Sequence, residues 1–367
     1  MTGPFKCDVL VIGAGPAGAT AALEAARAGA DVMIIDRKHV IGEPIACAGY
    51  IPAWITQHIK LNKKCIENKV AFMRTFMPDG STDDTKTPGY IVDRAAFDRD
   101  LVRQGLKHGA KLYAGMTVLK LNENGAEVRY KNDTYKIESK ITIGADGPKS
   151  VTGKYLGARV TEFIIAKQYE MMLKEPMDYS EVYFSDDYTG GYAWLFPKGK
   201  YANVGVGMIK SDALKMPARL EQFVEMLVEQ NKIHHNSNIR TAEGLVPIGG
   251  PLQCTVKNNV MLAGDAAGLT HPITGAGILS AVISGKEAGT VAAEALAKAK
   301  GDKVNPDDLK RYEKEWQCFL SSDLELAYNR RKLLNGYYLK EHDKFKTLAD
   351  AERKCWVVFK GYYHDDK

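Results

Sequence analysis

The first residues of the chain combine two apolar runs with a glycine-rich turn. Residues 8–12 read DVLVI, an apolar run rich in β-branched residues that is typical of a buried strand. The glycine-rich turn 13–18 follows, and the alanine-rich stretch after it, which ends near Gly29, has the pattern of a helix. A second apolar run, 31–35, ends at Asp36. The pattern therefore predicts a strand, helix, strand unit with a tight turn at its glycines.

The hydrophobic pattern changes twice further along the chain. An amphipathic helix is expected to begin after Asp93, its N-cap, and to reach about Lys107. From about Thr161 the chain consists of Tyr-, Phe- and Met-rich runs without helices between them, which favours an antiparallel sheet. A buried strand and a long small-residue helix between 260 and 300 then repeat the first pattern, and the chain beyond is helical and charged.

These changes predict an α/β protein with a Rossmann-like dinucleotide-binding lobe, an antiparallel-sheet substrate lobe and a helical C-terminal tail. The length of 367 residues agrees with two lobes, because single hydrophobic cores rarely grow so large. The dinucleotide-binding domain is expected to be discontinuous. The expected boundaries are 1–60, 90–160 and 255–302 for that domain, 61–89 and 161–254 for the sheet domain, and 303–367 for the helical region.

Net charge and cysteine spacing limit the classes of partner and cofactor that the sequence favours. The formal net charge is only +5, and no basic run with interleaved aromatic residues occurs, so we expect no nucleic-acid partner. The six cysteines form no CxxC pair, which argues against an iron–sulfur cluster or another metal site and favours a reducing cytoplasm. The first strand begins too early to leave room for a signal peptide. No apolar run approaches the length of a spanning helix, although a peripheral membrane contact stays open.

The glycines of the first turn have separate expected roles. Gly13 allows the tight turn, Gly15 lets backbone N–H groups approach a pyrophosphate, and Gly18 allows the helix to pack closely on the strand. The helix N-terminus favours a negatively charged phosphate. Asp36 follows about twenty residues beyond the glycines, where its carboxylate is expected to accept hydrogen bonds from a ribose hydroxyl. The alternative is a glycine-rich turn that binds nothing.

Two further turns make a flavin the expected cofactor. Asp146-Gly147 and Gly264-Asp265, the latter followed by PITG at 272–275, resemble, together with the first turn, the FAD-binding fold of para-hydroxybenzoate hydroxylase-type monooxygenases and their relatives. The resemblance implies FAD, with the start of the long helix after Gly275 facing the flavin ring. The implied cofactor-binding residues are Gly13, Gly15, Pro16, Ala17, Gly18, Asp36, Arg37, Cys47, Ala48, Arg99, Asp146, Gly264, Asp265, Gly275, Ala276, Gly277 and Ile278.

Two segments within that superfamily resemble geranylgeranyl reductases. The first is GEP at 42–44 with Cys47, and the second is YAWLFP at 192–197, which is similar to the YxWxFP pattern of that family. The resemblance implies saturation of isoprenoid C=C bonds by hydride from reduced FAD, on a small-molecule or lipid isoprenoid substrate. Cys47 would lie near the reacting bond. The implied substrate-binding residues, which would wall an apolar prenyl channel, are Tyr192, Trp194, Phe196 and Pro197.

The candidates for catalysis are Cys47, Tyr192 and His271, and each has an ordinary explanation beside the functional one. The loop reads Cys47-Ala48 where the family pattern has Cys-Gly, and a cysteine is often a small buried hydrophobe. His271 precedes Pro272 and could relay a proton, or could only hydrogen-bond the backbone of a tight turn. Aromatic residues on alternate strand positions are often plain core.

Two other functions stay open on the same scaffold. A single-component flavin monooxygenase or halogenase acting on an aromatic substrate is the alternative, because YAWLFP also resembles the WxWxIP of halogenases. An electron-transfer flavoprotein ranks last, since the chain lacks cluster-binding cysteine spacing. The electron donor would be NAD(P)H bound transiently at the flavin crevice, or a ferredoxin-like donor protein. Arg37, Arg94 and Arg99 would attract an anionic head group or ADP-ribose phosphate, or only face solvent.

Overall fold

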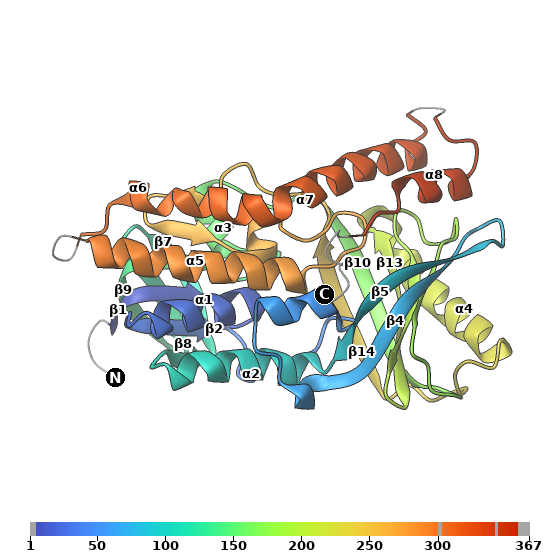
Figure 1. The fold of residues 1–367 in the computed structure, drawn as a ribbon, viewed down its shortest axis with the longest axis horizontal. Coiled ribbons are helices and arrows are strands. Elements are labelled where there is room, and N and C mark those ends of the chain that lie inside the picture. The colour runs from blue at the N-terminus through green and yellow to red at the C-terminus, as the bar shows by residue number, and fades with distance from the viewer. Residues whose placement is uncertain (1–4, 300–302, 342–343, 359–367) are drawn as a thin grey trace.

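Two eight-stranded sheets form the framework of the molecule (Figure 1). The computed structural model describes residues 5–299, 303–341 and 344–358. Sheet A contains the strands nearest the N-terminus and lies beside the longest helices, whereas sheet B forms the other half with α4 against it. The predicted α/β class, with a Rossmann-like lobe, a sheet lobe and a helical C-terminal region, is confirmed.

Sheet A brings the predicted glycine turns to one edge. Its central order is β15-β16-β9-β1-β2-β6, and β1 pairs in parallel with both β2 and β9. Because the carboxyl ends of parallel strands meet at one edge, the turns after β1, β9 and β16 lie together. The strands are β1 (Phe5–Ile12), β2 (Val32–Asp36), β6 (Lys111–Ala114), β7 (Met116–Asn122), β8 (Gly125–Tyr130), β9 (Asp133–Gly144), β15 (Val256–Lys257) and β16 (Val260–Leu262).

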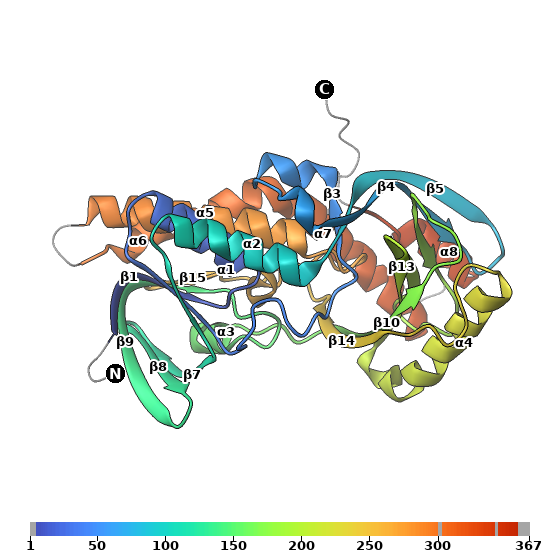
Figure 2. The same cartoon turned by 90° about the horizontal axis from the view of Figure 1, so that it is seen from below.

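Three helices cover one side of sheet A: α1 (Pro16–Arg27), α2 (Arg94–Lys107) and α5 (Ile278–Lys298). Figure 2 shows them together, with β7, β8 and α3 (Val151–Leu156) on the other side. The expected N-cap of α2 is confirmed, since the Asp93 carboxylate accepts from the N–H groups of Ala95 and Ala96. Glycines on α5 allow close packing, because a Cβ on Gly285 or Gly289 would overlap backbone oxygens of α1.

Sheet B has the order β14-β10-β13-β12-β11-β4-β5-β3. It is antiparallel as expected except for one pair, because β11 runs parallel to β4, a strand about a hundred residues earlier in the chain. One face packs on α4 (Met216–Glu229), and the other faces the loops of sheet A. The strands are β3 (Tyr50–Pro52), β4 (Ile66–Phe76), β5 (Thr82–Val92), β10 (Phe163–Met172), β11 (Ser180–Tyr183), β12 (Ala193–Lys198), β13 (Tyr201–Ile209) and β14 (Arg240–Pro247).

The C-terminal helices connect the two halves (Figure 1). They are α6 (Pro306–Leu309), α7 (Arg311–Tyr338) and α8 (Leu348–Cys355), and α7 packs on α5 at one end and on α8 at the other. Arg353 on α8 pairs with Asp79 in the turn between β4 and β5. Residues 359–367 of the expected helical region lie outside the described residues. No helix in the described ranges combines the length and the hydropathy needed to cross a bilayer.

Candidate active site

Two glycines of the first turn are required by backbone packing. Gly13 has a φ of +104°, which favours glycine, and a Cβ at this position would overlap the carbonyl oxygen of Ala145. A Cβ on Gly18 would overlap the carbonyl oxygen of Gly13. The turn, the start of α1 and the segment after β9 can therefore pack this closely only because Gly13 and Gly18 have no side chain.

Gly15 is different, because its surroundings are open. Its φ of −75° suits any residue, and no atom lies within 4 Å of the position that a Cβ would take. Gly15 is the N-cap of α1, and no side chain caps that helix. The helix start at Gly15 is therefore open, and no side chain accepts from the first N–H groups of α1 as a cap. The start of α5 at Gly277 also lacks a side-chain cap.

Asp36 and Asp146 accept hydrogen bonds from backbone N–H groups near the glycine turns. The Asp36 carboxylate accepts from the N–H of Ala14 and from the N–H of Lys38, both at 2.8 Å. Each oxygen keeps lone pairs for a ribose hydroxyl. Asp146 accepts from Ser150 and from the first N–H groups of α3, so its carboxylate fixes that helix start.

The third turn carries a buried carboxyl and a buried imidazole. Thr270 donates to Asp265, and burial raises the pKa of Asp265. His271 is 1% exposed, and its Nδ1 accepts from the N–H of Thr274 at 3.1 Å. Burial lowers the pKa of His271 to about 3, so the ring is neutral at physiological pH. This geometry favours an imidazole that orients its turn over one that donates a proton as imidazolium.

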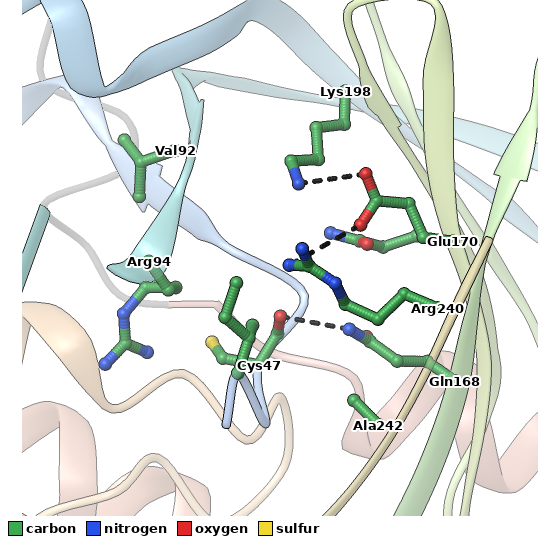
Figure 3. A pocket seen from close by; sticks show the side chains of 10 residues that line it. Cys47, Val92, Arg94, Gln168, Glu170, Lys198, Arg240 and Ala242 are labelled. Carbon is green, nitrogen blue, oxygen red and sulfur yellow. Dashed lines mark hydrogen bonds and ion pairs between the residues drawn. The ribbon is translucent and has the colours of Figure 1, made fainter. Parts of the chain in front are cut away.

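The Cys47 loop rests on sheet B. The Gln168 amide donates to the Cys47 carbonyl at 3.1 Å, and the Asn203 amide donates to the Ala48 carbonyl at 2.8 Å. The N–H of Gly49 points at the Cys47 sulfur, 3.4 Å away. Hydrogen bonds from strands β10 and β13 therefore hold the Cys47 loop against sheet B, and Figure 3 shows the one from Gln168.

Arg94 is the cation beside Cys47. Its guanidinium binds the Asp98 carboxylate at 3.1 Å, and both side chains are largely buried. Burial alone would lower the pKa of Arg94, but the charge of Asp98 and the neighbouring Cys47 outweigh that effect and raise it. Arg94 therefore stays charged. The other two predicted arginines lie elsewhere: Arg37 is exposed, and Arg99 donates to the 41–43 segment.

Aromatic side chains of β12 form a wall on the same face of sheet B. Trp194 lies against Gly205, where a Cβ would overlap the indole ring. The Tyr192 hydroxyl donates to the carbonyl of Thr274, and burial raises the pKa of Tyr192, so the phenol is neutral. Trp356, which follows α8, packs edge-on against Tyr192 with ring centroids 5.5 Å apart.

The other two predicted substrate residues of this stretch are Phe196 and Pro197. Phe196 and Trp194 belong to one buried cluster, and Tyr192 packs against it. These aromatic side chains are therefore part of the hydrophobic core as well as of the wall. Pro197 lies on the opposite face of β12, because successive strand residues alternate between faces. The prediction that Pro197 lines the channel does not agree with this placement.

The structure adds polar residues to this region that the sequence interpretation missed. They line a pocket with Cys47 and Arg94 and come from four strands of sheet B: Gln168, Glu170, Lys198, Asn203 and Arg240. The available signal was alternation, since Gln168 and Glu170 are polar positions two apart in the apolar strand β10. Within the described residues no group of three His, Cys, Asp or Glu side chains is placed to hold a metal ion.

Three comparisons relate this chain to known proteins. The family model described as Lycopene cyclase protein matches residues 8–332. Digeranylgeranylglycerophospholipid reductase 1 of Methanococcoides burtonii is 37% identical over 338 residues, which cover 86% of this chain and 81% of that protein. Among solved structures, a geranylgeranyl bacteriochlorophyll reductase-like protein from Thermoplasma acidophilum matches with a TM-score of 0.83 and 29% identity, covering 90% of this chain and 88% of that one.

A likeness to halogenases concerns the fold alone. The halogenase PltM, solved in complex with FAD, matches with a TM-score of 0.69 but only 14% identity, covering 89% of this chain and 77% of that one. The low identity carries no information on the reaction.

Proposed function

The chain belongs to the digeranylgeranylglycerophospholipid reductase family, and from this premise we propose that it is a FAD-dependent reductase that saturates C=C bonds of prenyl chains on a lipid. The observation that carries the proposal is the position of Cys47. Gln168 and Asn203 of sheet B bind the carbonyls of Cys47 and Ala48, and Cys47 lines one pocket with the buried Arg94.

The residues of the first and third turns suit FAD. The open space at Gly15 and the uncapped start of α1 would hold the pyrophosphate, with Asp36 toward the ribose. The uncapped start of α5, with Asp265 beside it, would face the flavin ring. When bound in its reduced form, FAD supplies a hydride.

Reduction of a C=C bond also needs a proton on the second carbon, and the chain has two candidates near the wall. We propose Cys47 as the donor, because the thiolate left behind would face the buried Arg94 cation. The Tyr192 hydroxyl is committed to the carbonyl of Thr274, so we assign it to positioning of that turn. His271 orients the same turn through Thr274.

The donor of electrons and the contact with a membrane are further parts of the proposal. NAD(P)H would approach the flavin crevice transiently, or a ferredoxin-like protein would reduce the flavin. A lipid substrate favours a peripheral membrane contact, and the reducing cytoplasm expected from the cysteines agrees with six free thiols.

Product analysis tests this function against the monooxygenase alternative. The protein is reduced with dithionite in the absence of oxygen and mixed with a digeranylgeranylglycerophospholipid in micelles. The molecular mass of the lipid is then measured by mass spectrometry. We expect a gain of two hydrogens for each saturated bond. An unchanged lipid, together with oxygen-dependent hydroxylation or halogenation of an added aromatic compound, would refute the reductase and support the alternative.

A further inference from the structure

The site-facing side of sheet B changes in character from one row of residues to the next. Strand pairing aligns residues of β14, β10, β13 and β12 into rows across this face. The outer row contains Arg240, Glu170, Asn203 and Phe196. The next row contains Ala242, Gln168, Gly205 and Trp194. Rows lie about 7 Å apart, because they are separated by two residues of extended chain. The outer row therefore contains two charged residues, and the next row contains none.

The charged end holds two cations around a single carboxylate. Lys198 Nζ lies 3.0 Å from one Glu170 oxygen, and Arg240 Nη1 lies 3.9 Å from the other. The second separation is too long for a hydrogen bond. Lys198 and Glu170 have side chains only 12% and 10% exposed, whereas that of Arg240 is 53% exposed. One positive charge is therefore left over, on a side chain with room to move.

This charged end opens toward the reacting region. Figure 3 shows Lys198, Glu170 and Arg240 on the sheet side of the pocket, with Cys47 and Arg94 on the opposite side. The charge of Arg94 is balanced by that of Asp98, so the net positive charge in the pocket comes from Lys198 and Arg240. A phosphate oxyanion placed between these two would meet one ammonium and one guanidinium, and guanidinium binds phosphate in a fork geometry.

We propose that Lys198 and Arg240 bind the anionic phosphate head group of the lipid, while the uncharged adjoining row, which contains Trp194, takes the start of its prenyl chain. This proposal rests on the proposed function. Glu170 holds Lys198 in place and loses its loose contact with Arg240 when the phosphate binds. An amphiphile with a phosphate ester next to a prenyl chain matches the change from charged to uncharged residues.

The test compares two lipids that share the same prenyl chains: digeranylgeranylglycerol phosphate and the same ether with a free hydroxyl. Dithionite serves as the reductant, so no nicotinamide competes for the pocket. The readout is the ratio of kcat/KM for the phosphorylated lipid to that for the neutral one. In Lys198→Gln/Arg240→Gln we expect this ratio to fall on the order of 100-fold, through loss of charge-assisted hydrogen bonds.

Two other variants distinguish loss of the head-group site from a general disturbance of the fold. Glu170→Gln removes the charge that competes for Arg240 but keeps an amide oxygen that accepts from Lys198. It should raise the ratio about fivefold, as expected for loss of the partly exposed pair with Arg240. Lys200→Gln, an exposed lysine in the adjacent hairpin turn, is the matched control and should keep the wild-type ratio. A ratio that stays constant in the double variant and in Glu170→Gln would overturn the head-group site.

Inorganic phosphate distinguishes the source of the anion. At millimolar concentration it should compete weakly with the phosphorylated lipid in the wild type and not in the double variant. If it instead competes equally well in the wild type and in the double variant, the anion binds away from Lys198 and Arg240, and the head-group proposal is overturned. Failure of the wild type to reduce either lipid would refute the proposed function itself, which is a separate result.

Discussion

The two halves of the active site are built in opposite ways. The glycine turn is local, since Gly13, Gly15 and Gly18 lie within six residues and their packing follows from that spacing. The sheet side is assembled from four strands, and strand register brings Lys198 and Arg240 to the same Glu170 carboxylate. A change in the local half should therefore lower the stability of the fold or its affinity for FAD, whereas a change in the assembled half should alter substrate preference.

Gly18→Val should break the local half most severely. The added side chain would overlap the carbonyl oxygen of Gly13, so α1 has to move away from β1. We expect the free energy of unfolding to fall by about 3 kcal/mol, the upper range for overpacking. Urea unfolding followed by circular dichroism measures this loss. A variant as stable as the wild type would contradict the packing role of Gly18.

Gly15→Val is the matched change at a position with space around it. No atom lies within 4 Å of the added Cβ, so the unfolding free energy of the apoprotein should change by less than about 0.5 kcal/mol. The FAD dissociation constant should rise on the order of 100-fold, or about 2.7 kcal/mol, because the side chain fills the phosphate space. Flavin fluorescence titration measures the dissociation constant. Unchanged FAD binding would refute the claim that the space at Gly15 holds the pyrophosphate.

Cys47→Ala tests the point where the two halves meet. The loop is held by backbone carbonyls, so FAD should be retained, while turnover should fall on the order of 100-fold if the thiol supplies the proton. Single-turnover reduction of the prenyl lipid measures the rate. Cys318→Ala, which changes an exposed cysteine on α7, is the control. Equal rates in the two variants would remove Cys47 from the chemistry.

His271 should make a smaller contribution, to the pH dependence of the free energy of unfolding. Its pKa is about 3 in the folded protein against 6.5 in the unfolded chain, so the unfolded state binds a proton first as pH falls. The contribution of His271 to stability is complete above pH 6.5 and is lost progressively between about 6.5 and 3. From pH 8 to pH 5 the wild type should lose about 2 kcal/mol more unfolding free energy than His271→Gln.

Unfolding by urea at the two pH values measures this difference, and His235→Gln, at an exposed histidine, should keep the wild-type pH dependence. Identical losses in the wild type and in His271→Gln would show that the imidazole titrates normally. An imidazolium would then again be a candidate proton donor.

The local features could be predicted from the sequence because their causes lie within a few residues. The glycine turn, the Asp93 cap and the small-residue helix α5 depend on backbone sterics and short-range hydrogen bonds. Pro197 was misplaced although strand alternation puts it opposite Trp194, so that signal was present but not used. The burial of His271 and the approach of Lys198 and Arg240 to Glu170 depend on tertiary packing and register, which the sequence pattern does not specify.

The central claim is that reduced flavin in this protein gives its hydride to a prenyl C=C bond. The most direct measurement is the flavin spectrum of the dithionite-reduced protein after anaerobic mixing with a digeranylgeranylglycerophospholipid. We predict return of the oxidised flavin spectrum without oxygen, in step with a gain of two hydrogens per bond in the lipid. A flavin that stays reduced until oxygen is admitted, with the lipid unchanged, would contradict the claim.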